Sequence, residues 1–156
     1  MASFWYTPSI TAIMQRDATK AIDLDGDASI KIGLSNSSHV PNRDDVFVTD
    51  GGDGFDIGEF NGTGYVGGFA GAGRKALVAK TCATDVTTDR TKFDADDPSL
   101  WTGFAAGTIA QATILKEITS NALSPVLTNL DFPDVAPAGN DFSIIFHVDG
   151  IGYIQT

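Results

Sequence analysis

The sequence has a single cysteine and few basic residues among its 156 positions. One cysteine, Cys82, excludes an internal disulfide, so packing and hydrogen bonds must hold the fold together. The 10 Lys and Arg residues stand against 20 Asp and Glu residues, which gives a formal net charge of −10. Because affinity for nucleic acids and anionic lipids comes first from clustered Lys and Arg, we expect the protein to bind neither. The simplest role of the acidity is solubility.

Long apolar runs are also missing. No stretch approaches the roughly 20 consecutive apolar residues that a membrane-spanning helix needs. Residues 1–8 lack the basic start and the apolar centre of a secretory signal peptide. We therefore expect a protein that is made in a cytoplasm and is not inserted in a membrane.

Apolar residues and glycine are abundant. The apolar share of 42% is enough for a core, and a chain of 156 residues is most simply a single domain. Charged residues make up 19%, below the share of about 25% in an average soluble domain. A low charge density suits a β-protein whose surface is partly covered by neighbours.

The apolar pattern predicts one short helix followed by strands. Residues 9–22 fit a helix, with Ser9 as its cap, and residues 28–34 fit a strand with Ile30, Ile32 and Leu34 on one face. Further strands are expected at residues 76–79, 91–97, 107–118, 125–132, 142–148 and 151–154. This spacing predicts an all-β fold, a mainly antiparallel β-sandwich or barrel-like structure with one short N-terminal helix.

The first eight residues predict an N-terminal arm in front of a β-sandwich domain at residues 9–156. Phe4, Trp5 and Tyr6 are consecutive, and consecutive side chains of an extended chain point to opposite sides. They cannot all face one core, so we expect an arm that docks on a neighbouring subunit. The alternative is a first strand that is packed on both of its faces.

A Gly-rich loop region at about residues 50–74 is the second predicted contact surface. A long segment without periodicity inside a compact domain is usually functional. It contains Phe55, Phe60, Tyr65 and Phe69, and aromatic side chains dominate the energetics of protein interfaces. Together with Phe4, Trp5 and Tyr6 they are the predicted interaction residues. The alternative for the loop aromatics is ordinary core packing.

No metal or cofactor site is predicted. His39 and His147, the two histidines, lack the spacing of a metal site. Residues 23–27 resemble the start of a calcium loop, but the position of its bidentate carboxylate holds Leu34. Residues 51–59 resemble one calcium-binding nonapeptide, but Gly58 replaces the apolar residue and stacked copies are missing.

Asp94 and Asp96 are the residues that a catalytic hypothesis would use. On a strand they share a face, and paired carboxylates can act as acid and base in a hydrolase. The favoured interpretation is a turn before Pro98, in which Asp side chains bond local backbone amides. We therefore expect no enzymatic activity.

Several blocks of the sequence resemble small virion structural proteins of tailed phages. The blocks are residues 91–97, which contain KFDADD, residues 124–132, residues 142–151, and the shorter stretches 30–34 and 62–65. The resemblance implies a virion component, and within that class a capsid decoration, or cement, protein on the outer surface of the head shell. Its partners would be the major capsid protein and copies of itself, with a homotrimer favoured, after synthesis in the bacterial host cytoplasm.

Two alternatives to this interpretation are kept. One is a tail, baseplate or head-fibre adhesin that binds a host surface glycan, with Trp101 and Tyr153 as stacking platforms. The other is the hydrolase that uses Asp94 and Asp96.

Overall fold

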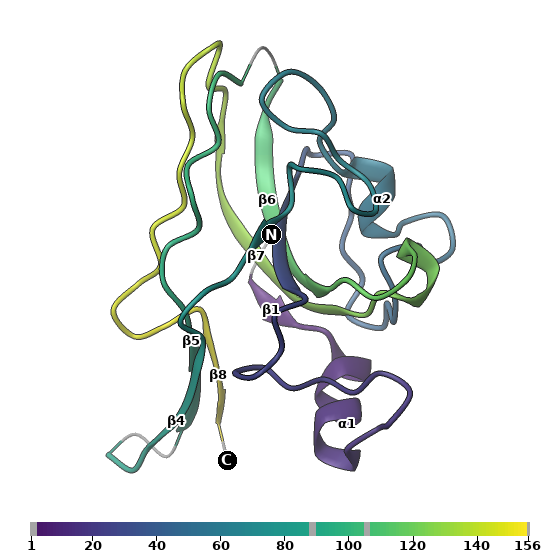
Figure 1. The fold of residues 1–156 in the computed structure, drawn as a ribbon, viewed down its shortest axis with the longest axis vertical. Coiled ribbons are helices and arrows are strands. Elements are labelled where there is room, and N and C mark those ends of the chain that lie inside the picture. The colour runs from purple at the N-terminus through teal and green to yellow at the C-terminus, as the bar shows by residue number, and fades with distance from the viewer. Residues whose placement is uncertain (1–2, 88–89, 105–106, 156) are drawn as a thin grey trace.

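A computed structural model describes residues 3–87, 90–104 and 107–155, and it contains two antiparallel sheets (Figure 1). The larger sheet consists, in spatial order, of β1 (Phe4–Trp5), β7 (Val126–Val135), β6 (Ile109–Lys116), β2 (Ile30–Ser35) and β3 (Lys75–Ala76). The smaller sheet consists of β4 (Thr81–Asp85), β5 (Arg90–Asp94) and β8 (Gly152–Gln155). The helical elements are α1 (Thr7–Gln15), α2 (Phe55–Gly58) and a 3-10 turn at Asn121–Leu123. The predicted all-β, mainly antiparallel fold with a short helix is confirmed.

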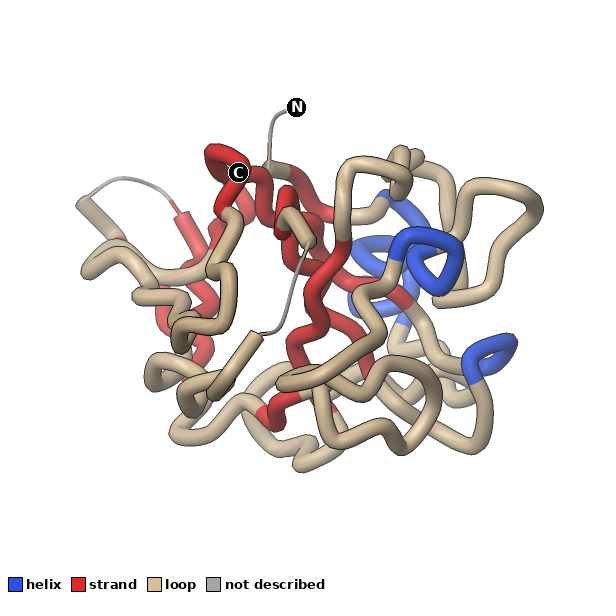
Figure 2. The backbone as a smooth tube through the Cα atoms, turned by 90° about the horizontal axis from the view of Figure 1, so that it is seen from above, coloured by secondary structure: helices blue, strands red, loops and turns tan. Residues whose placement is uncertain are grey.

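Strands β2, β6 and β7 form the centre of the larger sheet and are covered on both faces. Alternate residues enter two apolar clusters: Ile114 and Leu127 pack with Trp101 and Phe104, whereas the next residue on β6, Leu115, packs with a second group. That second group contains Tyr6, Val48, Phe55 and Val126. Burial on both faces explains why the apolar run of β6 shows no clean alternation. Figure 2 shows the strands gathered centrally and to one side, with the helices on the other.

The N-terminal residues are part of the larger sheet, which corrects the predicted arm. Phe4 pairs with Asn129 and Trp5 with Thr128, and the Tyr6 amide donates to the Leu127 carbonyl at 2.9 Å. Tyr6 is fully buried in the second cluster, while Trp5 contacts Phe93 on the other face. The three consecutive aromatic side chains are all accommodated because β1 packs on both of its faces against its own chain, as the alternative prediction stated.

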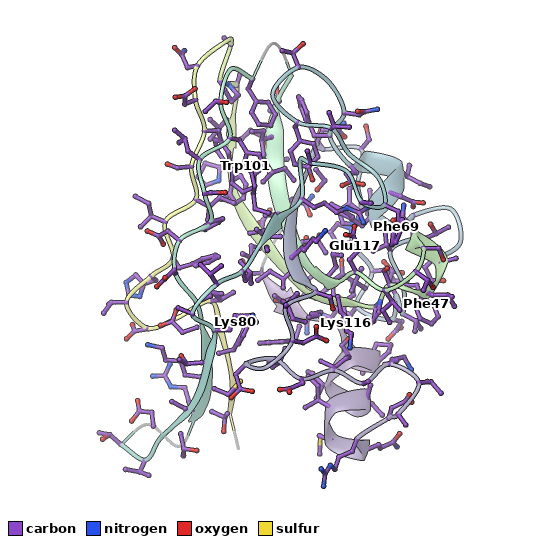
Figure 3. All side chains as sticks on the ribbon, viewed as in Figure 1. Phe47, Phe69, Lys80, Trp101, Lys116 and Glu117 are labelled. Atoms are coloured by element: carbon purple, nitrogen blue, oxygen red, sulfur yellow. The ribbon has the colours of Figure 1, made fainter. Side chains whose placement is uncertain are left out.

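Helix α1 begins and ends earlier than the predicted helix at residues 9–22. Pro8 lies in its first turn, where a missing amide costs nothing. Ser9 does not cap it; the buried Ser9 hydroxyl donates to the Val126 carbonyl. The helix ends because Arg16 adopts a left-handed conformation (φ 52°), with its amide directed at the carbonyls of Ala12 and Ile13. The following loop is tied down by Lys116, which contacts Asp27 and the Ala21 carbonyl, both at 2.6 Å (Figure 3).

The predicted strand at residues 142–148 is wrong. This segment is extended and lies at the outer margin of the molecule (Figure 1, yellow), but it pairs only through a bridge between Phe142 and Trp101. The alternation that suggested a strand is real, since Phe142, Ile144 and Phe146 face inward. No neighbouring strand is present to complete the ladder within the described part of the chain.

Candidate interaction surface

The structure places most of the predicted interaction residues in the core. Tyr6, Phe55 and Tyr65 are at most 1% exposed, and Phe60 is 7% exposed. Phe4 and Trp5 are partly buried against their own chain. Only Phe69 among the seven is exposed, with 42% of its surface accessible. The prediction that the loop aromatics form a contact surface is therefore wrong for Phe55, Phe60 and Tyr65, which follow the alternative of core packing.

The Gly-rich region folds inward because small residues let aromatic rings approach the sheet. A Cβ on Gly33 of β2 would lie 2.7 Å from the Phe55 ring and 3.0 Å from the Tyr65 hydroxyl. That hydroxyl accepts a hydrogen bond from the Leu34 amide at 3.0 Å and donates to Glu59 at 3.1 Å. Phe60 packs edge-on against Phe104, with 4.8 Å between ring centroids.

A buried ionic cluster of Arg74, Glu59 and Glu117 holds the same region in place. The Arg74 guanidinium forms two hydrogen bonds to Glu59, both 2.7 Å long, and one to Glu117 at 3.0 Å. Burial lowers the pKa of Arg74, but its bonds to these carboxylates outweigh burial and raise the pKa overall. Burial raises the pKa of Glu117, but hydrogen bonds, first of all from Lys31, lower it overall.

The ionic cluster also binds main-chain amides of the loop. The amide of Gly68 donates to Glu59 at 2.9 Å, and the amide of Ala70 donates to Glu117 at 3.0 Å. Phe69 lies between these two anchored residues, so its exposed side chain stands on a fixed backbone near Glu117 (Figure 3). The cluster is thus occupied in positioning the loop, and its contacts resemble structural ion pairs more than catalytic groups.

Asp45 and His39 are buried groups with shifted pKa values in the loop before α2. Burial raises the pKa of Asp45 to about 6, against the hydrogen bond from the Asn42 amide, and the charges of Asp53, Asp50 and Asp44 raise it further. Burial lowers the pKa of His39 to about 4, although nearby carboxylates oppose that shift. Among the described residues, no group of three or more His, Cys, Asp or Glu side chains is arranged to hold a metal ion.

Asp94 and Asp96, the residues of the hydrolase hypothesis, have separate contacts. Asp94 accepts from the Ala95 amide at 3.0 Å and pairs with Lys92 at 3.3 Å. Asp96 is exposed, and its amide donates to the Val78 carbonyl at 3.0 Å. Asp94 is the last residue of β5 and bonds a local amide, but no turn follows it at residues 95–100, so the predicted turn before Pro98 is wrong. The hydrolase hypothesis gains no support from these contacts.

Trp101 cannot serve as the glycan-stacking platform of the adhesin alternative. It is fully buried, and its indole Nε1 donates to the Gly73 carbonyl at 2.6 Å (Figure 3). The side chain of Tyr153, the other proposed platform, lies outside the described part of the structure. A stacking platform must present a free ring face to solvent, which Trp101 does not.

The outer segment at residues 142–148 exposes apolar surface that the sequence patterns assigned to a strand. Ile145 is 78% exposed and Val148 is 82% exposed. Beside the segment lies a shallow pocket of about 270 Å³, formed with the end of β7 and lined by Phe132, Val135, Phe142, Ser143, Ile144 and Ile145. The sequence signal that could have predicted this surface is the run of apolar residues. Consecutive Ile144 and Ile145 cannot both face inward in an extended chain, so one of them must be exposed or covered by a partner. This surface, which we call the outer edge, is the best candidate for an interaction surface.

A second exposed apolar group lies in and beside the Gly-rich region. Ile57, Val66 and Leu123 each expose more than half of their surface, and Phe69 somewhat less. These residues lie singly on loops and short helical elements. They do not share an extended segment with an unpaired main chain, as the residues of the outer edge do. Single exposed apolar residues are common on soluble proteins and need no partner to explain them.

Comparison of the chain with models of protein families, with curated proteins and with solved structures found no match. Within the described ranges, none of the helices is long and apolar enough to cross a bilayer.

Proposed function

We propose that the protein is a non-catalytic structural component of a tailed-phage particle, and specifically a capsid decoration protein. The proposal begins with the sequence blocks that resemble small virion proteins of tailed phages. The observation that supports it most is the outer edge, where Ile145 and Val148 are among the most exposed large apolar side chains of the described residues and lie on a segment that a pocket adjoins. Exposed apolar side chains beside a pocket are typical of a surface that another protein covers.

In this proposal the protein stabilises the head shell by mass action. A protein that binds only the assembled shell adds stability that grows by about 1.4 kcal/mol for each tenfold increase in affinity. Because a shell offers many equivalent sites, a modest affinity at each site sums to a large effect. The binding partners are the major capsid protein and further copies of this chain, with a homotrimer as the preferred assembly, and the site of action is the outer surface of the head.

The first test is the location of the protein on whole particles. Gold-labelled antibody against the chain should decorate the head surface uniformly in electron micrographs. Label confined to the tail tip would overturn the decoration proposal and support the adhesin alternative, in which the protein contacts a host surface.

The second test measures the stabilisation of the shell. Particles that lack the protein should release their DNA at a lower temperature than complete particles, and added purified protein should restore the higher temperature. An Ile145→Glu variant should restore it poorly, whereas Met14→Glu, on the exposed side of α1, should restore it fully. Equal heat stability with and without the protein would contradict the proposed role.

A further inference from the structure

The main chain of the outer edge has unused hydrogen-bonding groups. Among the described residues, the amides of Ser143, Ile144 and Ile145 donate no hydrogen bond. The main chain on either side of these three residues is hydrogen-bonded: Phe142 exchanges two bonds of 2.8 and 2.9 Å with Trp101, and the Phe146 amide donates to Asp97 at 2.7 Å. An extended segment with free amides and carbonyls is a template for pairing with another strand.

Side chains give the outer edge an apolar inner face and an outer face on which Ile145 stands between the polar Ser143 and His147. Phe142, Ile144 and Phe146 pack against the core cluster, which fixes the segment in position. Ile145 points away from that core and lines the pocket together with Val135, which is 39% exposed. A partner strand laid along the segment would place alternate side chains against Ile145 and Val135. In strand addition, main-chain bonds supply affinity and such pockets supply specificity.

The charges around the outer edge are acidic. Asp141 and Asp149 flank the segment, Asp97 bonds its Phe146 amide, and exposed Asp134 lies beside the pocket residue Val135. Lys92 reaches the segment, but its ammonium group is bound to the Val148 carbonyl at 2.7 Å and to Asp94 at 3.3 Å. His147 lies within 3.2 Å of Asp149. Such a rim complements basic residues on a partner.

A second copy of this chain fits the edge poorly. Antiparallel pairing of two copies about Ile145 would bring Asp141 of one copy toward the turn that carries Asp149 of the other, on both sides of the two-fold axis. Like charges brought together in this way repel each other. The net charge of −10 adds long-range repulsion between copies.

We propose that the outer edge binds an extended segment of a different protein by strand addition, and that this segment has apolar side chains at alternate positions and Lys or Arg at its ends. The inference rests on the proposed function of the protein as a binding component, and it specifies the partner's chemistry at that surface. It does not depend on whether the particle carries the protein on its head or on its tail.

Binding of defined peptides tests the proposal. The probe is a fluorescent pool of peptides with Lys at both ends, Val, Ile or Phe at alternate positions and Thr between them, titrated against the full chain. A matched pool replaces every Lys with Glu. We expect binding of the Lys pool to be at least about tenfold tighter than that of the Glu pool, and to weaken as salt is added.

Variants locate the binding. Ile145→Glu should weaken binding of the Lys pool by about tenfold or more, whereas Met14→Glu should leave it unchanged. Both side chains are more than 75% exposed, so both variants should fold, which circular dichroism verifies. Absence of Lys-pool binding, equal binding of both pools, or equal effects of the two variants would overturn the proposal.

Hydrogen exchange shows whether the main chain takes part. In the free protein the amides of residues 143–145 should exchange rapidly, and the bound Lys pool should slow them while leaving the amides of β4 unchanged. Concentration-dependent protection without peptide, together with a dimer in sedimentation, would show that a second copy is the occupant and would overturn the proposal. Gold label on the tail with intact peptide binding would refute only the decoration role.

Discussion

Arg74 is buried with its guanidinium between the carboxylates of Glu59 and Glu117. Desolvating these charges costs free energy that the hydrogen bonds must offset, so such a cluster adds little net stability over an apolar core. Removing one member of the cluster by mutation destabilises the protein strongly, because the remaining charges stay buried without compensation. The amides of the Gly-rich loop depend on the same carboxylates, so a defect at Arg74 should reach the loop.

Replacing Arg74 with Met should therefore lower the free energy of unfolding by about 3–5 kcal/mol. Urea denaturation followed by tryptophan fluorescence measures this loss. Lys75→Met, at the neighbouring and more exposed position, should change stability by about 0.5 kcal/mol or less. Adding Glu59→Gln to Arg74→Met should recover part of the loss, since it removes one unpaired buried charge. Equal losses in the two single variants would contradict a structural role for the cluster.

Asp45 and His39 should give opposite pH dependences of stability. Asp45 has a pKa of about 6 in the folded protein, above its ordinary value of 3.8, so its contribution to stability decreases as the pH rises from about 4 to 6. His39 has a folded pKa of about 4, below its ordinary 6.5, so its contribution decreases as the pH falls from about 6.5 to 4. The two effects oppose each other in the wild-type protein.

Single substitutions should reveal each effect. The stability of Asp45→Asn relative to wild type should rise between pH 4 and 6 and then level off, because the variant avoids a buried charge. The stability of His39→Gln relative to wild type should rise as the pH falls from about 6.5 to 4, because no imidazole needs protonation on unfolding. Urea unfolding at a series of pH values measures both. Asp134→Asn, at an exposed site, serves as the control, and parallel curves for all three variants would contradict the assignments.

At the scale of elements, Gly33 in the middle of β2 shows how packing overrides strand propensity. Glycine weakens a strand because it lacks a side chain and loses more backbone freedom. Here it is required, since a Cβ would lie 2.7 Å from the ring of Phe55. The glycine lets α2 and the Gly-rich region approach the sheet closely.

Gly33→Ala should therefore destabilise the protein by about 1–3 kcal/mol, although alanine is the better strand former. Gly52→Ala is the matched control, because a Cβ there meets nothing within 4 Å, and it should change stability by less than about 1 kcal/mol. Thermal unfolding followed by circular dichroism distinguishes the two. Similar melting temperatures for both variants would show that Phe55 moves aside without cost.

The outer edge and β6 show that strand propensity alone does not decide whether a segment pairs in a sheet. Both contain Ile-rich extended sequences, yet β6 pairs on both sides with β2 and β7, while residues 142–148 pair only at Phe142. A free edge of this kind is usually protected by charge or by a short length. The flanking Asp141 and Asp149 serve that purpose, and the partner proposed above would complete the pairing.

At the scale of the whole molecule, the N-terminal residues join the larger sheet. Pairing of Phe4 with Asn129 and burial of Tyr6 connect the start of the chain to β7. Each fully buried large apolar side chain contributes about 1.5–3 kcal/mol. The segment should therefore be part of the cooperative unit rather than an appendage.

A truncated chain that begins at Thr7 should consequently lose at least about 3 kcal/mol of stability, because it loses β1 and Tyr6. A chain that begins at Ser3 retains these residues and should unfold like the full-length protein. Differential scanning calorimetry measures both. A melting temperature of the shorter chain equal to that of the full chain would show that residues 3–6 act as an independent arm after all.

Several features of this protein were determined by the sequence alone. The alternation of Ile30, Ile32 and Leu34 and the β-branched run at β6 specify strands, because a strand repeats every two residues and these patterns are local. The single cysteine excludes an internal disulfide without any knowledge of the fold. The all-β class followed from these local signals.

Only the tertiary structure decided which apolar residues are free for a partner. Phe55, Phe60 and Tyr65 looked like candidates for an interface, but the sheet and Phe104 cover them, whereas Phe69 and Ile145 stay exposed. Pairing and burial join residues far apart in sequence, as Phe4 and Asn129 show. A local pattern indicates only that burial of an apolar side chain is favourable. The arrangement of the whole chain determines whether other residues of the same chain bury it.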